Sequence, residues 1–233
     1  MKKWIWILLA AMLLPAASCT TSGKKQDKQE ESEETIQAEQ TEEEPRQQRK
    51  RFKPMSDEES RHLLFKGVPI DGSLRQYVSR MESVGFTLEG VHDNGMAVLS
   101  GDFAGWKNCL IFVSTLDSRD VVNHISVRFP SCDKWADLEH GYTQLKSMLT
   151  EKYGKPARSV EKFHDYFSYP NKDSEKLRCL RSDECTYYAQ FELEKGEILL
   201  SLEHEGYDAV FVALQYWDKI NTELVKQDAI NDL

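Results

Sequence analysis

The sequence predicts an α+β fold in which antiparallel sheets of meander strands are covered by helices. A helix with an apolar stripe precedes about four strand-like segments, and this order occurs twice, in residues 71–130 and 133–218. Short turns join successive strands, which is typical of antiparallel meanders. Each sheet needs one covered face, and the apolar stripe of a helix can cover it.

The first half begins with a capped helix. Ser73 and Gln76 have the spacing of a capping box, and Gly85 ends the helix with a residue type that adopts positive φ. The apolar stripe of this helix comprises Leu74, Tyr77, Val78, Met81 and Val84. Strands are predicted at 86–91, 96–103, 108–116 and 121–129. A short helix over 57–64 is expected to lead into this half.

The second half repeats that order. A long helix that Gly154 and Pro156 end is predicted from apolar residues at helical spacing, namely Trp135, Leu138, Tyr142, Leu145 and Leu149. The predicted strands are 160–167, 186–193, 198–204 and 209–217. A polar loop is expected over 169–184, and a short helix or frayed tail over 218–233.

The N-terminus has the order of a secretory signal. Lys2 and Lys3 precede an uninterrupted apolar run over 4–14, and Pro15 and small residues follow that run. The run is shorter than the ~20 residues that a membrane-spanning helix needs. Residues 1–18 are therefore expected to be removed as a signal peptide.

Cys19 directly follows this signal. The run Ala16-Ala17-Ser18-Cys19 resembles the lipobox of bacterial lipoproteins, although leucine is commoner where Ala16 stands. The resemblance implies that Cys19 is lipidated and anchors the protein in the bacterial cell envelope, at the outer membrane or the periplasmic face. Several acyl chains on one cysteine hold a membrane firmly, because each buried CH₂ contributes about 0.8 kcal/mol. The alternative is a cleaved, secreted protein with a spare cysteine.

Residues 19–54 are expected to form a disordered, charged tether. Ile36 and Ala38 are the only aliphatic residues between Thr20 and Pro54, too few to offset chain entropy. Such a coil spans on the order of 30 Å root-mean-square and would lift the domain of residues 55–233 off the membrane. From Met55 onward, 20 basic and 30 acidic residues give a net charge of -10. That charge disfavours binding to nucleic acid.

Four further cysteines are candidates for disulfides. In an oxidising envelope they could form the pairs Cys179–Cys185 and Cys109–Cys132, and the first pair is the easier because it encloses a short polar loop. A metal site is not expected, because no Cys-x₂-Cys pair is present and no histidine lies at ligand spacing from these cysteines.

No catalytic or cofactor motif is recognisable in the chain. The six histidines form no His-Glu-x-x-His pair, and no nucleophile elbow or phosphate-binding loop occurs. His124 is expected on the polar, exposed face of its strand. The most unusual segment is loop 101–108, where two glycines lie among the aromatic residues Phe103 and Trp106. These two rings could bind a glycan or peptide, or could simply pack between strands.

The repeated order of a helix and then strands covers about 150 residues. It resembles the tandem α/β repeat of the beta-lactamase-inhibitor-protein-like lipoproteins, whose repeat generally has two helices before its strands. The run FAGWKNC and the Lys/Glu-rich tether are also similar to lipoproteins of gut Bacteroidales. These resemblances imply a lipoprotein of the envelope. They do not specify its oligomeric state.

The leading hypothesis is a non-catalytic, membrane-tethered protein that binds a partner protein or has a structural role in the envelope. Its grounds are the anchor, the long spacer and the missing catalytic motif. A glycan- or peptide-binding module that uses Phe103 and Trp106 is the second hypothesis, and an enzyme with dispersed residues is the third.

Overall fold

The computed structural model describes residues 52–92, 94–116, 119–164, 170–231 and 233. The expected signal peptide, Cys19 and nearly all of the expected tether lie outside the described residues. The predicted α+β fold with antiparallel meander strands is confirmed. The helices are α1 (Leu74–Ser83), α2 (Trp135–Tyr153), α3 (Asp173–Arg181) and α4 (Lys219–Asn231).

Ten strands form two sheets in the described residues. A small hairpin consists of β1 (Leu64–Phe65) and β2 (Val68–Pro69). The first half of the large sheet contains β3 (Thr87–Val91), β4 (Met96–Phe103), β5 (Trp106–Leu116) and β6 (Arg119–Arg128). The second half contains β7 (Arg158–Phe163), β8 (Cys185–Leu193), β9 (Gly196–Glu205) and β10 (Ala209–Asp218).

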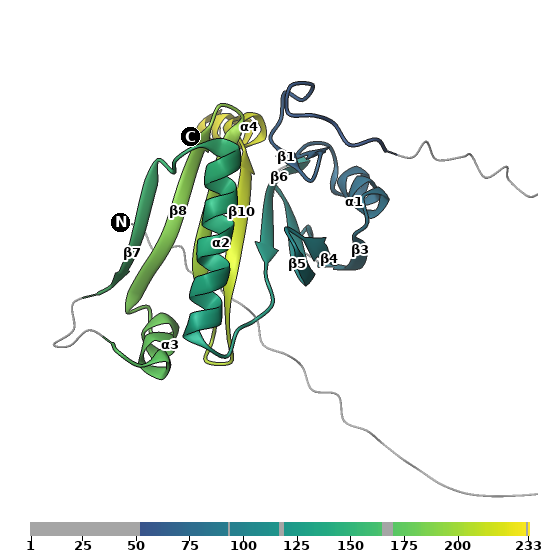
Figure 1. The fold of residues 1–233 in the computed structure, drawn as a ribbon. Coiled ribbons are helices and arrows are strands. Elements are labelled where there is room, and N and C mark those ends of the chain that lie inside the picture. The colour runs from purple at the N-terminus through teal and green to yellow at the C-terminus, as the bar shows by residue number, and fades with distance from the viewer. Residues whose placement is uncertain (1–51, 93, 117–118, 165–169, 232) are drawn as a thin grey trace, which may run out of the picture. The chain divides into compact units, whose positions relative to one another are not determined.

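The two halves form one continuous sheet of eight antiparallel strands. The strand order is β3-β4-β5-β6-β10-β9-β8-β7, so each half is a meander and the last strands of the halves meet (Figure 1). At that junction Ala213 pairs with Arg128, and Trp217 pairs with His124. The predicted helix-plus-four-strand repeat is therefore present, with α3 as an addition between β7 and β8.

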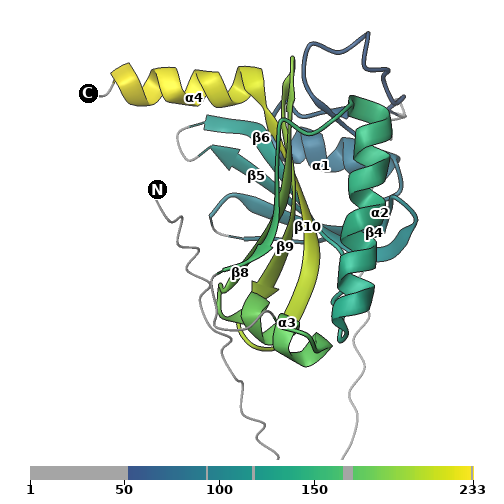
Figure 2. The same cartoon turned by 60° about the vertical axis from the view of Figure 1, so that its left-hand side comes forward.

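Helices α1 and α2 lie on one face of this sheet, whereas α4 projects from the end of β10 on the opposite side (Figure 2). The residues of the central strands that face α1 and α2 are buried in a shared core, for example Ile111, Ile125 and Leu214. The predicted helical stripes supply the other side of that core, including Tyr77 and Trp135. The capping box of Ser73 and Gln76 is also present at the start of α1.

The segment 57–64 is not the expected helix. It contains a turn and then enters the hairpin, in which Lys66 and Gly67 both have positive φ (49° and 75°). Two successive positive φ angles are typical of the tight turns that join paired strands. The hairpin buries Leu64, Phe65 and Val68 in the core, which an exposed leading helix would not do.

The expected polar loop over 169–184 instead contains α3. This helix buries Leu177, Cys179 and Leu180, which lie on one helical face among polar neighbours. The apolar stripe is too short to stand out in the sequence, and burial against the sheet and α2 stabilises it.

Candidate functional site

Phe103 and Trp106 lie at the tight end of the β4–β5 hairpin and pair with each other across it. The ring of Phe103 stacks on Phe65 with centroids 4.8 Å apart, and Trp106 meets Phe129 edge-on at 5.3 Å. Both side chains pack against the core. This packing accounts for the two aromatics without a ligand, and a ligand site at this hairpin stays a prediction.

All four cysteines of the described chain carry free thiols, so neither expected disulfide is present. Cys179 lies on α3 and Cys185 opens β8, and the backbone between them is closed by a hydrogen bond from Glu184 N to Cys179 O (2.7 Å). Burial, and then the neighbouring Cys179, raise the pKa of Cys185 to about 12. Cys109 is buried and Cys132 half-buried. Bridge formation stays a prediction for an oxidising compartment.

The sheet face opposite α1 and α2 is a broad surface, and we call it the open face. Among the described elements only α4 contacts this side, near β6, β9 and β10 (Figure 2). The strand register places the following side chains on the open face: Val98, Leu110, Phe112, Ser114, His124, Ser126, Arg128, Tyr188, Gln190, Glu192, Glu197, Leu199, Ser201, Glu203, Phe211, Ala213, Gln215 and Trp217.

The open face carries apolar side chains in both halves of the sheet. One cross-strand row runs from Val98 and Phe112 through Ser126 and Gln215 to Leu199. All five of these side chains are half-buried. The aliphatic and aromatic members lie outside the core cluster on the helix side. The row is therefore partly solvated apolar surface, interrupted by the polar side chains of Ser126 and Gln215.

One corner of the open face is acidic. Glu192 and Glu197 are directly opposite each other on β8 and β9, and Glu197 is also opposite Trp217 on β10. Within the described part of the chain, neither carboxylate has a side-chain hydrogen bond or ion pair. Like charges directly opposite in a sheet destabilise it. No described side chain compensates that repulsion, and a cation from outside would relieve it.

Arg128, the cation nearest the centre of the open face, is already engaged. Its guanidinium forms an ion pair with Glu205 and stacks over the Phe211 ring, 4.1 Å from the ring centroid. It therefore does not neutralise the acidic corner.

His124 differs from the exposed residue that the alternation of its strand predicts. It is only 8% exposed and stacks on Trp217 with centroids 4.8 Å apart. Burial lowers the pKa of His124 to about 4, and a hydrogen bond with the Gln215 side chain opposes that shift. Its Nε2 atom has no partner among the described residues. The expectation of a surface histidine was wrong because the Trp217 ring covers it.

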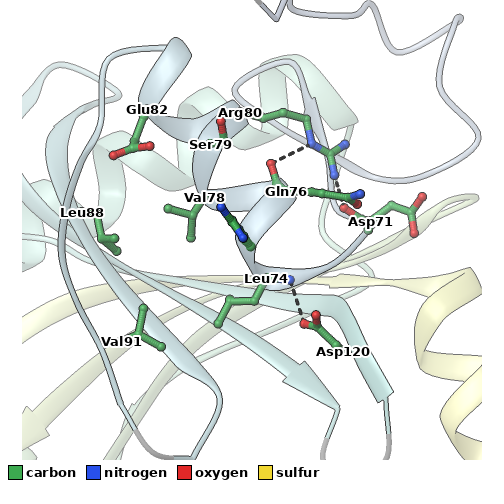
Figure 3. A pocket seen from close by; sticks show the side chains of 12 residues that line it. Asp71, Leu74, Gln76, Val78, Ser79, Arg80, Glu82, Leu88, Val91 and Asp120 are labelled. Atoms are coloured by element: carbon green, nitrogen blue, oxygen red, sulfur yellow. Dashed lines mark hydrogen bonds between the residues drawn. The ribbon is translucent and has the colours of Figure 1, made fainter. Parts of the chain in front are cut away.

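A groove lies between α1 and β3 at the edge of the sheet, on the helix side (Figure 3). Its volume is about 1100 Å³. We call it the α1–β3 groove. It is lined by Asp71, Gly72, Leu74, Arg75, Gln76, Val78, Ser79, Arg80, Glu82, Leu88, Val91 and Asp120. Asp120 of β6 fixes one end, because its Oδ1 accepts a hydrogen bond from Leu74 N at 2.9 Å.

A buried polar junction attaches α4 to the domain. Asp218 is fully buried and accepts hydrogen bonds from Leu63 N (2.9 Å) and Asn221 N (2.9 Å), and His62 Nδ1 lies 3.1 Å from its carboxylate. The Asn221 side chain donates to the backbone carbonyls of Ile70 and Val122, each at 3.0 Å. The junction therefore ties three separate chain segments together. No sequence signal pointed to it.

Across the described residues, no group of three or more His, Cys, Asp and Glu side chains could hold a metal ion. Nor is any helix in that part of the chain long and apolar enough to span a membrane. In comparisons with known proteins, no family model, curated protein or solved structure matches this chain. The resemblance to beta-lactamase-inhibitor-protein-like lipoproteins therefore stays a prediction.

The open face could have been anticipated from one sequence signal. The segments 110–113 and 209–214 are continuous apolar runs, whereas a half-solvated strand alternates. Such runs place apolar side chains on both faces of a strand. The sequence could not indicate that α1 and α2 would both cover the same one of those faces.

Proposed function

We propose that this chain is a lipoprotein of the bacterial envelope, tethered through Cys19, whose folded domain binds a partner protein through the open face. The observation that carries the proposal is the open face itself. It combines half-buried apolar side chains with acidic groups that no described side chain neutralises.

The N-terminal sequence supports the anchor. A basic start, an apolar run and small residues lead directly to Cys19. The charged segment that follows gives the domain reach away from the membrane, where a partner is accessible.

The chemistry of the open face indicates the kind of partner. Val98, Phe112 and Leu199 offer half-buried apolar surface along one cross-strand row, and apolar patches at a protein surface mark interaction sites. At the corner, a lysine or arginine of the partner would relieve the repulsion between Glu192 and Glu197. The partner is therefore a protein whose apolar patch is bordered by basic side chains.

Site-specific photo-crosslinking in native envelopes tests this proposal. The full chain carries benzoylphenylalanine in place of Leu199 on the open face or, as a matched control, in place of Met148, which is 43% exposed on α2 on the other side of the sheet. We expect an adduct with one protein from position 199 and none from position 148. Combining E192K and E197K with the position-199 probe should reduce the adduct at least about tenfold, since like charges at an interface cost several kcal/mol.

An adduct from position 199 supports the proposal only together with the control position and the effect of charge reversal. Equal adducts from positions 148 and 199, an adduct only with a second copy of this chain, or no effect of charge reversal would each contradict it. The anchor is tested separately by cell fractionation. Cys19→Ala should leave the membrane fraction, and if it stays there the lipoprotein assignment is wrong whatever the crosslinking shows.

A further inference from the structure

The turn between β3 and β4 presents an exposed asparagine that is followed by a glycine. A hydrogen bond from His92 N to Met96 O (2.8 Å) closes this turn, and another runs from Gly95 N to His92 O (3.1 Å). Gly95 has a positive φ of 73°, a conformation that glycine adopts without steric cost. Asn94 precedes it and is exposed. Asn-Gly is a dipeptide that hairpin turns favour, so the pair has a structural reason to stand here.

The surroundings of Asn94 fit an attack by the next backbone nitrogen on its side-chain amide. Asn94 Oδ1 accepts a hydrogen bond from Met96 N at 3.3 Å. A donor at that oxygen stabilises the negative charge that the oxygen gains when a nitrogen adds to Cγ. Gly95 has no Cβ to crowd the attacking nitrogen, which must give up only its exposed turn bond to His92 O. No hydrogen bond to another described residue holds Asn94 Nδ2, so this nitrogen is free to leave into solvent.

Asn221 shows the opposite arrangement. It is only 2% exposed. Its Nδ2 donates to the backbone carbonyls of Ile70 and Val122, each at 3.0 Å, and to Asp71 Oδ1 at 3.2 Å. The Asn221 amide is therefore held by three acceptors and shielded from water, and it serves as an internal control.

We propose that Asn94 is a site of spontaneous covalent modification, at which the side-chain amide is converted to a carboxylate. Asparagine is among the thermolabile residue types. The Gly95 nitrogen bonds to Asn94 Cγ, and the bond from Cγ to Nδ2 breaks. The proton of Gly95 N–H leaves with Nδ2 as ammonia, and a cyclic imide remains. Water then opens the imide at either of its carbonyls, which gives aspartate or isoaspartate. No electrons are exchanged, and water is the co-reactant.

The modification changes one edge of the large sheet. β3 is an edge strand, and its neighbour in the sheet is β4. Isoaspartate adds a carbon to the backbone of the turn, together with a negative charge. The longer backbone no longer matches the hydrogen bonds that join His92 to Met96 and to Gly95. We therefore expect the amide of His92 to exchange its hydrogen faster in chains that carry isoaspartate. This site does not depend on the open face or on the proposed function.

Incubation of the full chain at neutral pH, followed by peptide mass spectrometry and an ammonia assay, tests the proposal. We expect aspartate and isoaspartate at position 94, formed at a rate comparable with that of the same chain unfolded in guanidinium chloride. Asn221 should stay intact in the folded chain. The matched variant N94Q keeps an exposed amide, but its longer side chain disfavours ring closure. It should lose nearly all of the ammonia release while its urea unfolding stays that of the wild type.

Three results would each overturn the proposal. The first is an intact Asn94 in the folded chain after the unfolded chain has reacted, because the turn would then protect it. The second is modification of Asn108, which is also exposed, at the rate of Asn94. The third is ammonia release that N94Q leaves unchanged. Unchanged hydrogen exchange at His92 in the isoaspartate chains would overturn the effect on β3.

Discussion

His124 combines burial with an unpartnered polar atom, and its protonation is therefore linked to folding. Burial lowers its pKa to about 4, whereas an unfolded chain has the ordinary value near 6.5. Between these values the unfolded state binds more protons than the folded state. The contribution of His124 to stability is fully present above the unfolded pKa and is lost as the pH falls toward the folded pKa.

Because of this residue, we expect the free energy of unfolding to fall by about 2 kcal/mol when the pH is lowered from 7.5 to 5. The variant His124→Phe keeps an aromatic ring against Trp217 and removes the titrating group. Urea unfolding at both pH values should show a pH-dependent loss in the wild type that is smaller by that amount in the variant. Parallel losses in the two proteins would show that His124 titrates normally.

Replacing glycine with alanine should have different effects at Gly196 and at Gly206. A Cβ at Gly196 would lie 2.1 Å from the carbonyl oxygen of Trp217 on the neighbouring strand, whereas a Cβ at Gly206 would meet open space. Gly196→Ala should destabilise the protein by roughly 3 kcal/mol, because the backbone must move. Gly206→Ala should cost only about 1 kcal/mol, from its positive φ of 57°. Chemical denaturation of both variants checks this ranking, and similar losses would contradict it.

Helix α4 depends on the junction of Asp218 and Asn221 more than on its own apolar face. Asp218→Ala leaves Leu63 N and Asn221 N without their acceptor, and unsatisfied buried donors cost about 1–3 kcal/mol each. We expect a loss of roughly 3 kcal/mol in the free energy of unfolding, with faster hydrogen exchange at both amides. Glu223→Ala, on the exposed part of α4, should leave the free energy of unfolding nearly unchanged. Equal effects of the two substitutions would disprove a special role of the junction.

The strand elements were easier to predict from sequence than the short helix α3. Ile125 and Val127 alternate with polar residues along β6, and this period indicates a strand before any tertiary contact is known. In α3 the buried residues number only three, and the polar residues around them favour a loop. Local propensity does not favour a helix here, and burial of these three side chains against the domain stabilises it.

The two halves are coupled through the middle of the sheet and through loop contacts. β6 pairs with β10, and beyond β6 the backbone continues with hydrogen bonds from Phe129 N to Val212 O (3.0 Å) and from Cys132 N to Val210 O (2.9 Å). Residues 55–131 alone would leave β6 as an unpaired edge whose buried side chains Ile125 and Val127 lose part of their cover. Such an edge promotes aggregation.

We therefore expect the chain to unfold as one unit. Tryptophan fluorescence and far-UV circular dichroism should give coincident urea transitions for the full chain. A fragment of residues 55–131 should show no cooperative transition. A cooperative transition in that fragment, or two separated transitions in the full chain, would show that the halves are independent.

The sequence by itself determined the order and periodicity of most elements and the helix-plus-strands repeat, because these follow from local spacing of apolar residues and from turn chemistry. It also carries the whole basis for the anchor at Cys19. Only the tertiary structure decided that β6 and β10 join the halves into one sheet and that α1 and α2 both lie on the same face of it. These features depend on pairings between residues far apart in the chain. The local spacing of apolar residues does not specify such pairings.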